Sequence, residues 1–449
     1  MAGGRGAMIG IGVLGAVFAL GLGVGAAPAQ TTTAVAGETD LAAFRRLRTE
    51  GMAARQAGDL AQAERSLAAA ERHLPNHPGV IVLRARIAAE DDRPDDAIRQ
   101  LELYAAAGLT ADLTQVTALA PLLASPAGAS ISEAQRANGE PVGAAALGEI
   151  AAIPGSGLVE AIVRDPANGR WLVSQVRGRT ILALSDDGTV TPWLADDPER
   201  SAVVGLAIDP ARGVLWAATM ALPPATHGRL ADAAPVEPAL LRIDLDTAAV
   251  VQRYALPDGA TERGAGDVAL GPDGTVYVAN PVGGDLFRLR PAAEALEVMR
   301  APGVLGSPQG MVAGDDGALI VADYSSGIWR VGADGSTQRL AAPSDAVLIG
   351  VDGLIDGGDA LYAIQNGTAP QRVLRLTLSA GRDRIEATEV LAANLPRIDE
   401  PTTGLIHEGD LVFVSRSQWS AFDGEGALRE PEPAPALISR LRLPPRSAP

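Results

Sequence analysis

The chain has 449 residues, a hydrophobic fraction of 47% and a formal net charge of −17, which suits a globular protein with room for more than one domain. The negative charge disfavours nucleic acids and anionic membranes as partners, because their phosphates would repel it. There is no cysteine and no lysine, which excludes disulfides, thiolate nucleophiles and Schiff-base chemistry. Only His227 and His407 lie in the C-terminal two-thirds, too few for a three-histidine zinc site there.

Residues 1–29 are typical of an export signal. Arg5 supplies the positive flank, Met8 to Val24 the apolar run, and Ala27-Pro28-Ala29 a small-x-small cleavage site. Six glycines in and around the apolar run weaken the alternative of a stable membrane anchor. We therefore expect cleavage near Ala29 and a flexible start over 30–40. The mature protein is then expected to be periplasmic or secreted and not bound to a membrane.

Residues 41–123 are predicted to form helical repeats, because Ala, Leu, Arg and Glu dominate and β-branched residues are few. Gly58–Ala63 matches Asp92–Ala97 at a fixed offset in the sequence. The offset equals the tetratricopeptide period of about 34 residues, and the segment resembles an array of about two such repeats. Such an array would bind a peptide or protein partner, or it would act as a structural cap or dimerisation element. The sequence leaves both roles open.

Six copies of one pattern follow, and they predict a six-bladed β-propeller over 147–449. Each copy is an apolar strand, a turn rich in Gly and Asp, and a second apolar strand. Equivalent positions recur after roughly 40 to 60 residues, a spacing typical of propeller blades. The expected fold class is thus an all-β six-bladed propeller preceded by a small all-α helical-repeat domain. We call the residue that opens each innermost strand its anchor, and expect it to face the central channel; the anchors are Glu160, Val204, Gly266, Gln309, Asp352 and Thr403.

The two ends of the propeller are expected to meet. The last copy runs through Leu411–Ser415 and Ala436–Leu443 and lacks an outer strand. Gly148–Ile153 lies just before the first copy, and we expect it to supply that strand and cover the exposed edge. Residues 124–146, before this strand, are small and polar and are predicted to be a linker.

Three anchors carry oxygen ligands: Glu160, Gln309 and Asp352. Two carboxylates facing a narrow channel would repel each other unless a cation or a proton relieves them. Oxygen donors without His or Cys favour calcium, magnesium or manganese over zinc. The alternative is that these residues cap strand starts or bond to backbone and channel water.

The fragments 351–366 (VDGLIDGGDALYAIQN) and 308–324 (PQGMVAGDDGALIVADY) resemble the strand repeats of the gluconolactonase/senescence-marker-protein (regucalcin-like) family. The resemblance covers roughly 150–445. It implies a six-bladed, calcium-dependent lactone hydrolase whose metal is held by a Glu on blade one, an Asn on blade four and an Asp on blade five. Glu160 and Asp352 match two of these, and Gln309 replaces the Asn with a longer amide. The resemblance also makes Asp352 the general base.

The residues that bind the substrate in that family are matched less well by this sequence. Its blade-three Asn aligns with Gly266, and its Arg just upstream aligns with Gly264, one residue from Arg263. A long loop, Ala221–Ala239, contains His227 and could form a lid with that histidine as proton carrier, although a solvated histidine is the alternative. The candidate substrate-binding residues are Arg263, His227, Asn280, Asp323 and Asn366.

The leading hypothesis is an exported protein that hydrolyses a lactone, a small ester or a related sugar-like molecule with the help of a divalent cation. Calcium is the first candidate for this cation. The alternative is a non-catalytic module that binds a peptide, glycan or envelope protein. A third class, quinone-dependent sugar oxidation, would need basic and histidine contacts that are scarce in this sequence.

Overall fold

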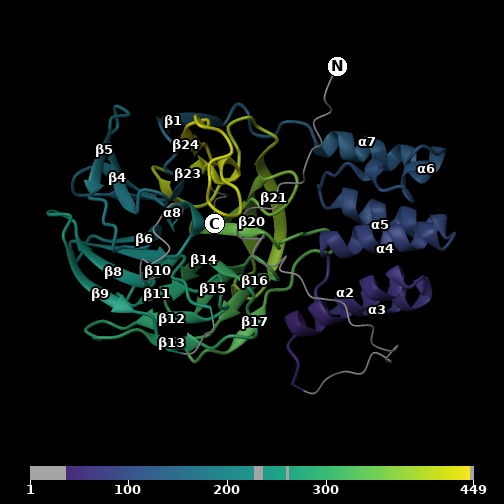
Figure 1. Ribbon diagram of the computed structural model, residues 1–449, viewed down its shortest axis with the longest axis horizontal. Helices are drawn as coiled ribbons and strands as arrows, with labels where there is room; N and C mark the ends of the chain where they lie inside the picture. Colours follow the sequence, from purple (N-terminus) through teal and green to yellow (C-terminus); the bar gives the residue numbers. More distant parts are fainter. Residues whose placement is uncertain (1–36, 227–235, 259–261, 445–449) are drawn as a thin grey trace.

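The computed structural model describes residues 37–226, 236–258 and 262–444. It shows a helical module beside a ring of six four-stranded antiparallel sheets (Figure 1). The predicted fold class is therefore confirmed. The predicted export signal and His227 lie outside the described residues. Within the described part, none of the helices is long and apolar enough to span a membrane.

The helical module begins with two antiparallel helix pairs, α2 with α3 and α4 with α5. Their bounds are α2 Asp40–Gln56, α3 Leu60–His73, α4 Pro78–Glu90 and α5 Pro94–Ala106. The side chains of Thr39 and Asp59 cap α2 and α3 by accepting backbone N–H groups. Proline opens α4 and α5, where its missing N–H is not needed. Leu67 and Leu101, which are separated by the repeat offset of the sequence, are both fully buried, so that offset corresponds to a structural repeat.

The predicted linker over 124–146 is wrong in part. After α5 come η1 Leu113–Gln115, α6 Ala120–Leu123, η2 Pro126–Gly128 and α7 Ala129–Asn138. Ile131 of α7 is buried against Leu113 and Leu119, and the backbone carbonyl of Asn138 accepts a hydrogen bond from Asn394 Nδ2 at 2.8 Å. A single buried side chain stabilises this short helix, and small polar residues around it hid the pattern.

Five blades use their strands in chain order from the axis outward, and the sixth takes β1 as its outer strand. Blade 1 is β2 Val159–Asp165, β3 Arg170–Gln175, β4 Thr180–Leu184 and β5 Val190–Leu194; blade 2 is β6 Ala202–Asp209, β7 Val214–Met220, β8 Ala239–Asp244 and β9 Val250–Ala255. Blade 3 is β10 Val268–Leu270, β11 Val276–Ala279, β12 Leu286–Leu289 and β13 Glu297–Arg300; blade 4 is β14 Pro308–Ala313, β15 Leu319–Asp323, β16 Gly327–Val331 and β17 Thr337–Arg339. Blade 5 is β18 Val351–Asp356, β19 Leu361–Gln365, β20 Arg372–Leu378 and β21 Ile385–Ala393; blade 6 is β22 Gly404–His407, β23 Asp410–Arg416, β24 Ala436–Leu441 and β1 Leu147–Ile153.

The innermost strands approach one another closely just after their anchors. A Cβ on Gly310 would lie 2.4 Å from Leu354 N, and one on Gly353 would lie 2.4 Å from Thr402 O. Neither position can hold a larger residue without moving the next blade, which explains the glycine that follows several anchors. In blade 3 the equivalent residue is Asp267.

The predicted closing strand is confirmed. β1 pairs with β24 in antiparallel fashion, with Leu147 opposite Leu441 and Ile153 opposite Ala436. Ile153 is buried in a hydrophobic cluster that includes Val159 of blade 1. The N-terminal strand of the propeller therefore completes the last blade and also packs against the first.

The helical module contacts the propeller at the face where the innermost strands begin, which we call the mouth face. Thr39 Oγ1 donates to Gly303 O at 2.8 Å, before β14. Asn76 Nδ2 donates to Ala346 O at 3.2 Å, before β18. Both acceptors lie in loops that enter an innermost strand, so the module sits beside blades 4 and 5 (Figure 1).

Candidate functional site at the mouth of the propeller

Two predicted ligands, Glu160 and Asp352, lie close enough for their charges to interact. The pKa of Glu160 is well above its usual range, first because protein surrounds the carboxyl and then because Asp352 carries the same charge. Burial, and next the charge of Asp267, raises the pKa of Asp352 to about 7. Two acids from blades 1 and 5 thus share a region where neither ionises easily.

Two further carboxylates belong to the same region, and sequence reasoning missed both. Burial raises the pKa of Asp267 to about 7, and its charge acts on Glu160 and Asp352. The pKa of Glu400 is also raised to about 7, mainly by burial, with Asp352 among the like charges that act on it. Glu160, Asp267, Asp352 and Glu400 are called the mouth carboxylates below.

A hydrogen bond orients each of the two predicted carboxylates. Trp419 Nε1 donates to Glu160 Oε2 at 2.7 Å, from the short helix η3 Trp419–Ala421 between β23 and β24. Asn366 Nδ2 donates to Asp352 Oδ2 at 2.6 Å, from the end of β19. Because one oxygen of each acid is held, the position of the carboxylate is set before any ligand arrives.

Glu400 is held differently. Its side chain is 7% exposed, and its Oε2 is buried without a hydrogen-bond partner in the described part of the chain. Its backbone N–H donates to Gln371 Oε1 at 2.6 Å, and its φ of 50° is in the left-handed region. Holding a non-glycine residue in this conformation costs free energy, which the surrounding contacts must offset.

Gln309, the third predicted ligand, lies on the neighbouring innermost strand. Its side chain is 4% exposed, and its Nε2 donates to Ser307 Oγ at 3.3 Å. A Cβ on the next residue, Gly310, would lie 2.8 Å from Asp352 O, which shows how closely β14 and β18 pack. The amide is therefore one strand away from Asp352, with its Nε2 bonded within its own blade.

Three predicted substrate-binding residues hold loops together instead of joining the mouth carboxylates. Asn280 is fully buried and donates to Glu262 O at 3.0 Å and to Asp285 Oδ1 at 2.6 Å. Asp323 is fully buried and accepts backbone N–H groups, one of them from Ser325 at 2.9 Å. Arg263 donates to the backbone carbonyls of Leu256 and Pro257. Of the candidates for substrate binding, Asn366 alone contacts a mouth carboxylate among the described residues.

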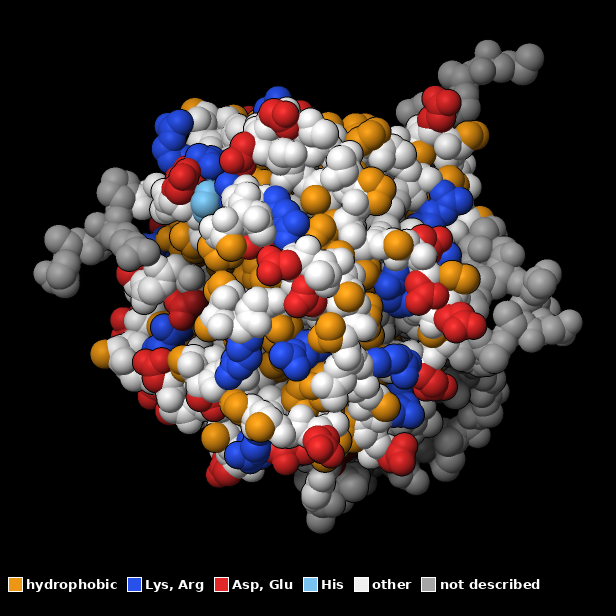
Figure 2. Space-filling model, turned by 90° about the vertical axis from the view of Figure 1, so that its left-hand side faces the viewer, with side chains coloured by type: hydrophobic (Ala, Val, Ile, Leu, Met, Phe, Trp, Pro, Cys, Tyr) orange, Lys and Arg blue, Asp and Glu red, His pale blue; other side chains and the backbone are white. Residues whose placement is uncertain are grey.

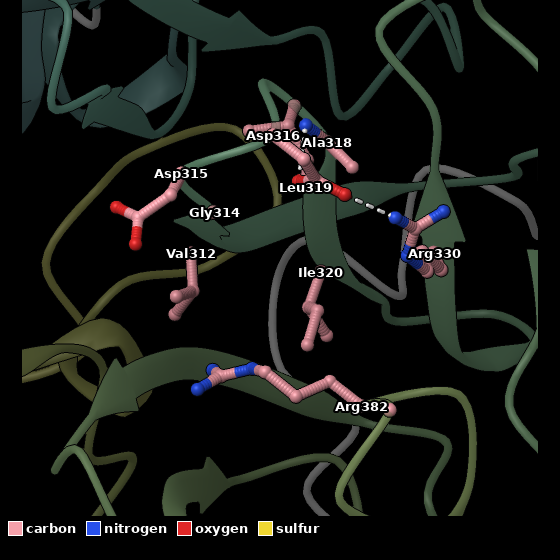
Figure 3. A pocket seen from close by; sticks show the side chains of 10 residues that line it. Val312, Gly314, Asp315, Asp316, Ala318, Leu319, Ile320, Arg330 and Arg382 are labelled. Carbon is pink, nitrogen blue, oxygen red and sulfur yellow. Dashed lines mark hydrogen bonds and ion pairs between the residues drawn. The ribbon is translucent and has the colours of Figure 1, made fainter.

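A small pocket lies at the opposite end of blade 4, away from the mouth face (Figure 3). Its volume is about 240 Å³, below the ~300–1,000 Å³ usual for small-molecule sites. Arg330 at its edge pairs with Asp316, and Arg382 donates to Asp356 Oδ2 at 2.9 Å. Both guanidinium groups are thus already neutralised, so neither is free to attract an anionic ligand to the pocket.

On the side that carries blades 1 and 2, the outer surface bears charges of both signs. Figure 2 shows acidic and basic side chains interspersed with hydrophobic ones over this side. Charges of both signs are therefore mixed on this side, whereas the mouth carboxylates carry one sign.

Comparison with protein-family profiles and with curated sequences finds no match. Solved structures of similar shape include a gluconolactonase from Xanthomonas campestris, at 18% identity over 66% of this chain and 89% of that chain, with a TM-score of 0.45. A calcium-binding regucalcin from Agrobacterium tumefaciens is 14% identical over 64% of this chain and 90% of the other, with a TM-score of 0.44. A virginiamycin B lyase from Staphylococcus aureus is 16% identical over 64% and 80%, with a TM-score of 0.42. Such likenesses concern the fold alone, and the six-bladed propeller is established by the sheets of this chain itself.

Proposed function

We propose that the propeller is a hydrolase of a lactone or small ester and that it uses a divalent cation. The cation would be bound by oxygen atoms of Glu160, Gln309 and Asp352, and calcium is the first candidate. The observation that carries this proposal is the pair Glu160 and Asp352. Both have raised pKa values, and no arginine is among the groups that shift them in the described part of the chain. A buried like-charge pair without a counterion is the arrangement that a bound cation would stabilise.

The donor set fits a hard cation that binds oxygen. Among the described residues, no three Asp, Glu or His side chains come together as a ligand set, so two carboxylates need the amide of Gln309 as a partner. Glu400 is not part of such a ligand set, although the charge of Asp352 acts on it and its Oε2 is buried without a hydrogen-bond partner among the described residues. Calcium accepts mixed carboxylate and amide oxygens.

The bound cation would polarise the carbonyl of the substrate. The chain's own contribution is the placement of a base. Asn366 holds Asp352 Oδ2 and leaves the other oxygen of that carboxylate to take a proton from water. Trp419 holds Glu160 through its own hydrogen bond to Oε2. In this proposal Asp352 is the catalytic residue, and Asn366 and Trp419 position the two acids.

A second candidate function is ligand binding without catalysis. One observation favours it: Asn280, Asp323 and Arg263 are occupied by loop contacts, and Gly266 offers no side chain. The mouth would then bind a ligand but lack groups that orient a lactone for attack. Under either function, a periplasmic or secreted location and a peptide partner for the helical module remain part of the proposal.

The test is calcium binding and hydrolysis by the purified mature protein. After treatment with EDTA, added calcium should raise the melting temperature, because the ion binds only the folded state. Glu160→Gln and Asp352→Asn should each abolish the shift. Asp356→Asn is the matched control, since Asp356 is an exposed acid at the other end of β18.

Hydrolysis is then measured on a panel of lactones and small esters. Loss of turnover in Asp352→Asn and not in Asp356→Asn is expected. Calcium binding without turnover on the whole panel would favour the binding module. A wild-type protein whose melting is indifferent to calcium, magnesium and manganese would refute the cation site.

A further inference from the structure

We propose that the helical module supports the loop 366–371 of blade 5 and thereby positions Asp352 and Glu400, with Arg372 and Thr110 as positioning residues. The inference rests on the proposed function only for its consequence in cation binding. It gives the helical module a part in the site, which neither a peptide-binding role nor a capping role requires.

The loop 366–371 holds two mouth carboxylates. At its start, Asn366 Nδ2 donates to Asp352 Oδ2 at 2.6 Å and to Pro401 O at 3.0 Å. Near its end, Gln371 Oε1 accepts from the backbone N–H of Glu400 at 2.6 Å. The loop therefore sets the orientation of Asp352 and the strained backbone of Glu400.

The helical module in turn holds the loop. The backbone N–H of Thr110 donates to Ala369 O, in the middle of the loop, at 2.7 Å. Tyr104 of α5 supports this contact, because its hydroxyl donates to Thr110 O at 3.2 Å. A segment that follows α5 is thus bonded directly to the loop that bonds to the acids.

Arg372, the first residue after the loop, is the strongest link. Its side chain is 4% exposed, its NH1 donates to Ala107 O at 3.0 Å, and its Nε donates to Gln365 Oε1 at 2.6 Å. Ala107 is the C-cap of α5, where the helix dipole favours a cation. Arg372 has no carboxylate partner in the described residues, so these acceptors are what make its buried charge tolerable.

A second loop is held together with the first. Gln365 Nε2 donates to Val347 O at 2.9 Å and to Ile349 O at 2.6 Å, just before β18. The Val347 side chain packs against Ile81 and Tyr104 of the helical module. The backbone N–H of Gly367 then donates to Gly350 O at 3.0 Å. The start of β18, which carries Asp352, and the loop 366–371 are therefore fixed to the same helices.

The experiment uses the full-length protein with two pairs of variants. Arg372→Met removes the guanidinium, and Arg375→Met is its control because Arg375 is on the same strand but pairs with Asp359. Thr110→Pro removes the N–H that bonds to Ala369, whereas Thr110→Ala keeps it. Hydrogen exchange at the amides of Gly367 and Glu400 reports on the loop directly.

We expect Arg372→Met, which loses two hydrogen bonds, and Thr110→Pro, which loses one, to speed exchange at both amides and to weaken calcium binding, each by at least about tenfold. The two controls should match the wild type. Arg372→Lys should restore part of the effect, because an ammonium keeps the charge but cannot span both acceptors as a planar fork does.

Unchanged exchange and unchanged calcium affinity in folded Arg372→Met or Thr110→Pro would overturn the inference. If Arg372→Met does not fold, Thr110→Pro decides. A wild-type protein that binds no calcium refutes the proposed function, and the exchange measurement then decides the positioning role by itself. Equal effects in Arg375→Met would show a general loss of stability and would also contradict it.

Discussion

Acidic side chains have different neighbours in the helical module and at the mouth of the propeller. In the module, acids face arginines: Arg55 donates to both oxygens of Glu90 at 2.8 and 2.6 Å, and Arg84 bonds to Glu64. At the mouth, Glu160 and Asp352 face other acids. Charges with partners inside the fold stabilise the fold, whereas charges left without partners indicate a site that awaits a ligand.

The largest expected effect is on closure of the ring, for which the helical module has no counterpart. Ile153→Asp places a charge in the cluster between the first and last blades and should cost about 3–5 kcal/mol of unfolding free energy. Ala152→Asp, on the exposed face of the same strand, should cost little. Denaturant unfolding measures both, and equal losses would show that β1 is not critical to the ring.

Next in size is the loss of a buried leucine within the module. Leu67 and Leu101 occupy equivalent places in the two helix pairs and are both fully buried. Leu67→Ala and Leu101→Ala should each lower the unfolding free energy by about 2–4 kcal/mol. A loss at one position alone would break the structural equivalence of the pairs. Chemical denaturation followed by the helical signal provides the measurement.

The two regions should respond to pH in opposite directions. Burial first, and then the charge of Arg48, lowers the pKa of His77 in the module to about 4. The unfolded pKa is about 6.5, so the stability tied to neutral His77 is complete above that pH and is lost as pH falls toward 4. His77→Gln should remove about 3 kcal/mol of this dependence. Melting between pH 4 and 6.5 provides the measurement, and His73→Gln, at a half-buried histidine that contacts Asp40, is the comparison.

Glu400 should show the reverse sign. Its folded pKa of about 7 lies above the unfolded value of about 4.3. The stability tied to protonated Glu400 is therefore complete below pH 4.3 and is lost as pH rises through 7, by about 3 kcal/mol. In EDTA, Glu400→Gln should flatten that loss. A wild-type protein whose stability does not fall over this range would show that Glu400 has another source of stabilisation.

The smallest effect is expected at the ion pairs of the helical module. Arg55→Gln leaves Glu90 with its other partner, Arg86, and the pair is partly exposed. The cost should be about 0.5–1 kcal/mol and should shrink at high salt. A cost several times larger, unchanged by salt, would mean that the module depends on charge as strongly as the mouth does. Urea titrations at low and high salt separate the two cases.

Much of the fold could be predicted from the sequence because its signals are local and repeated. The alternating strands, the fixed offset between the helix pairs and the unpaired last blade are visible in single segments. The helix α7 could not be predicted, because Ile131 is its single buried residue and its sequence has no periodic pattern of apolar residues.

For a related reason, only two of the four mouth carboxylates could be predicted from the sequence. Glu160 and Asp352 stand at repeated anchor positions, so alignment of the blades found them. Asp267 stands one residue beyond an anchor, where close packing usually requires glycine, and that departure was the available signal. Glu400 lies outside the repeat in a left-handed conformation, and its place depends on contacts that no pattern records.

The pairing of β1 with β24 also sets the order of events in biosynthesis. The strand that closes the ring is made first among the propeller strands, and its partner is made last. β1 therefore has no partner strand until the last strand of the propeller has been made. A chain that stops before Ala436 would lack β24 and leave β1 as an unpaired strand, whose free backbone groups favour aggregation.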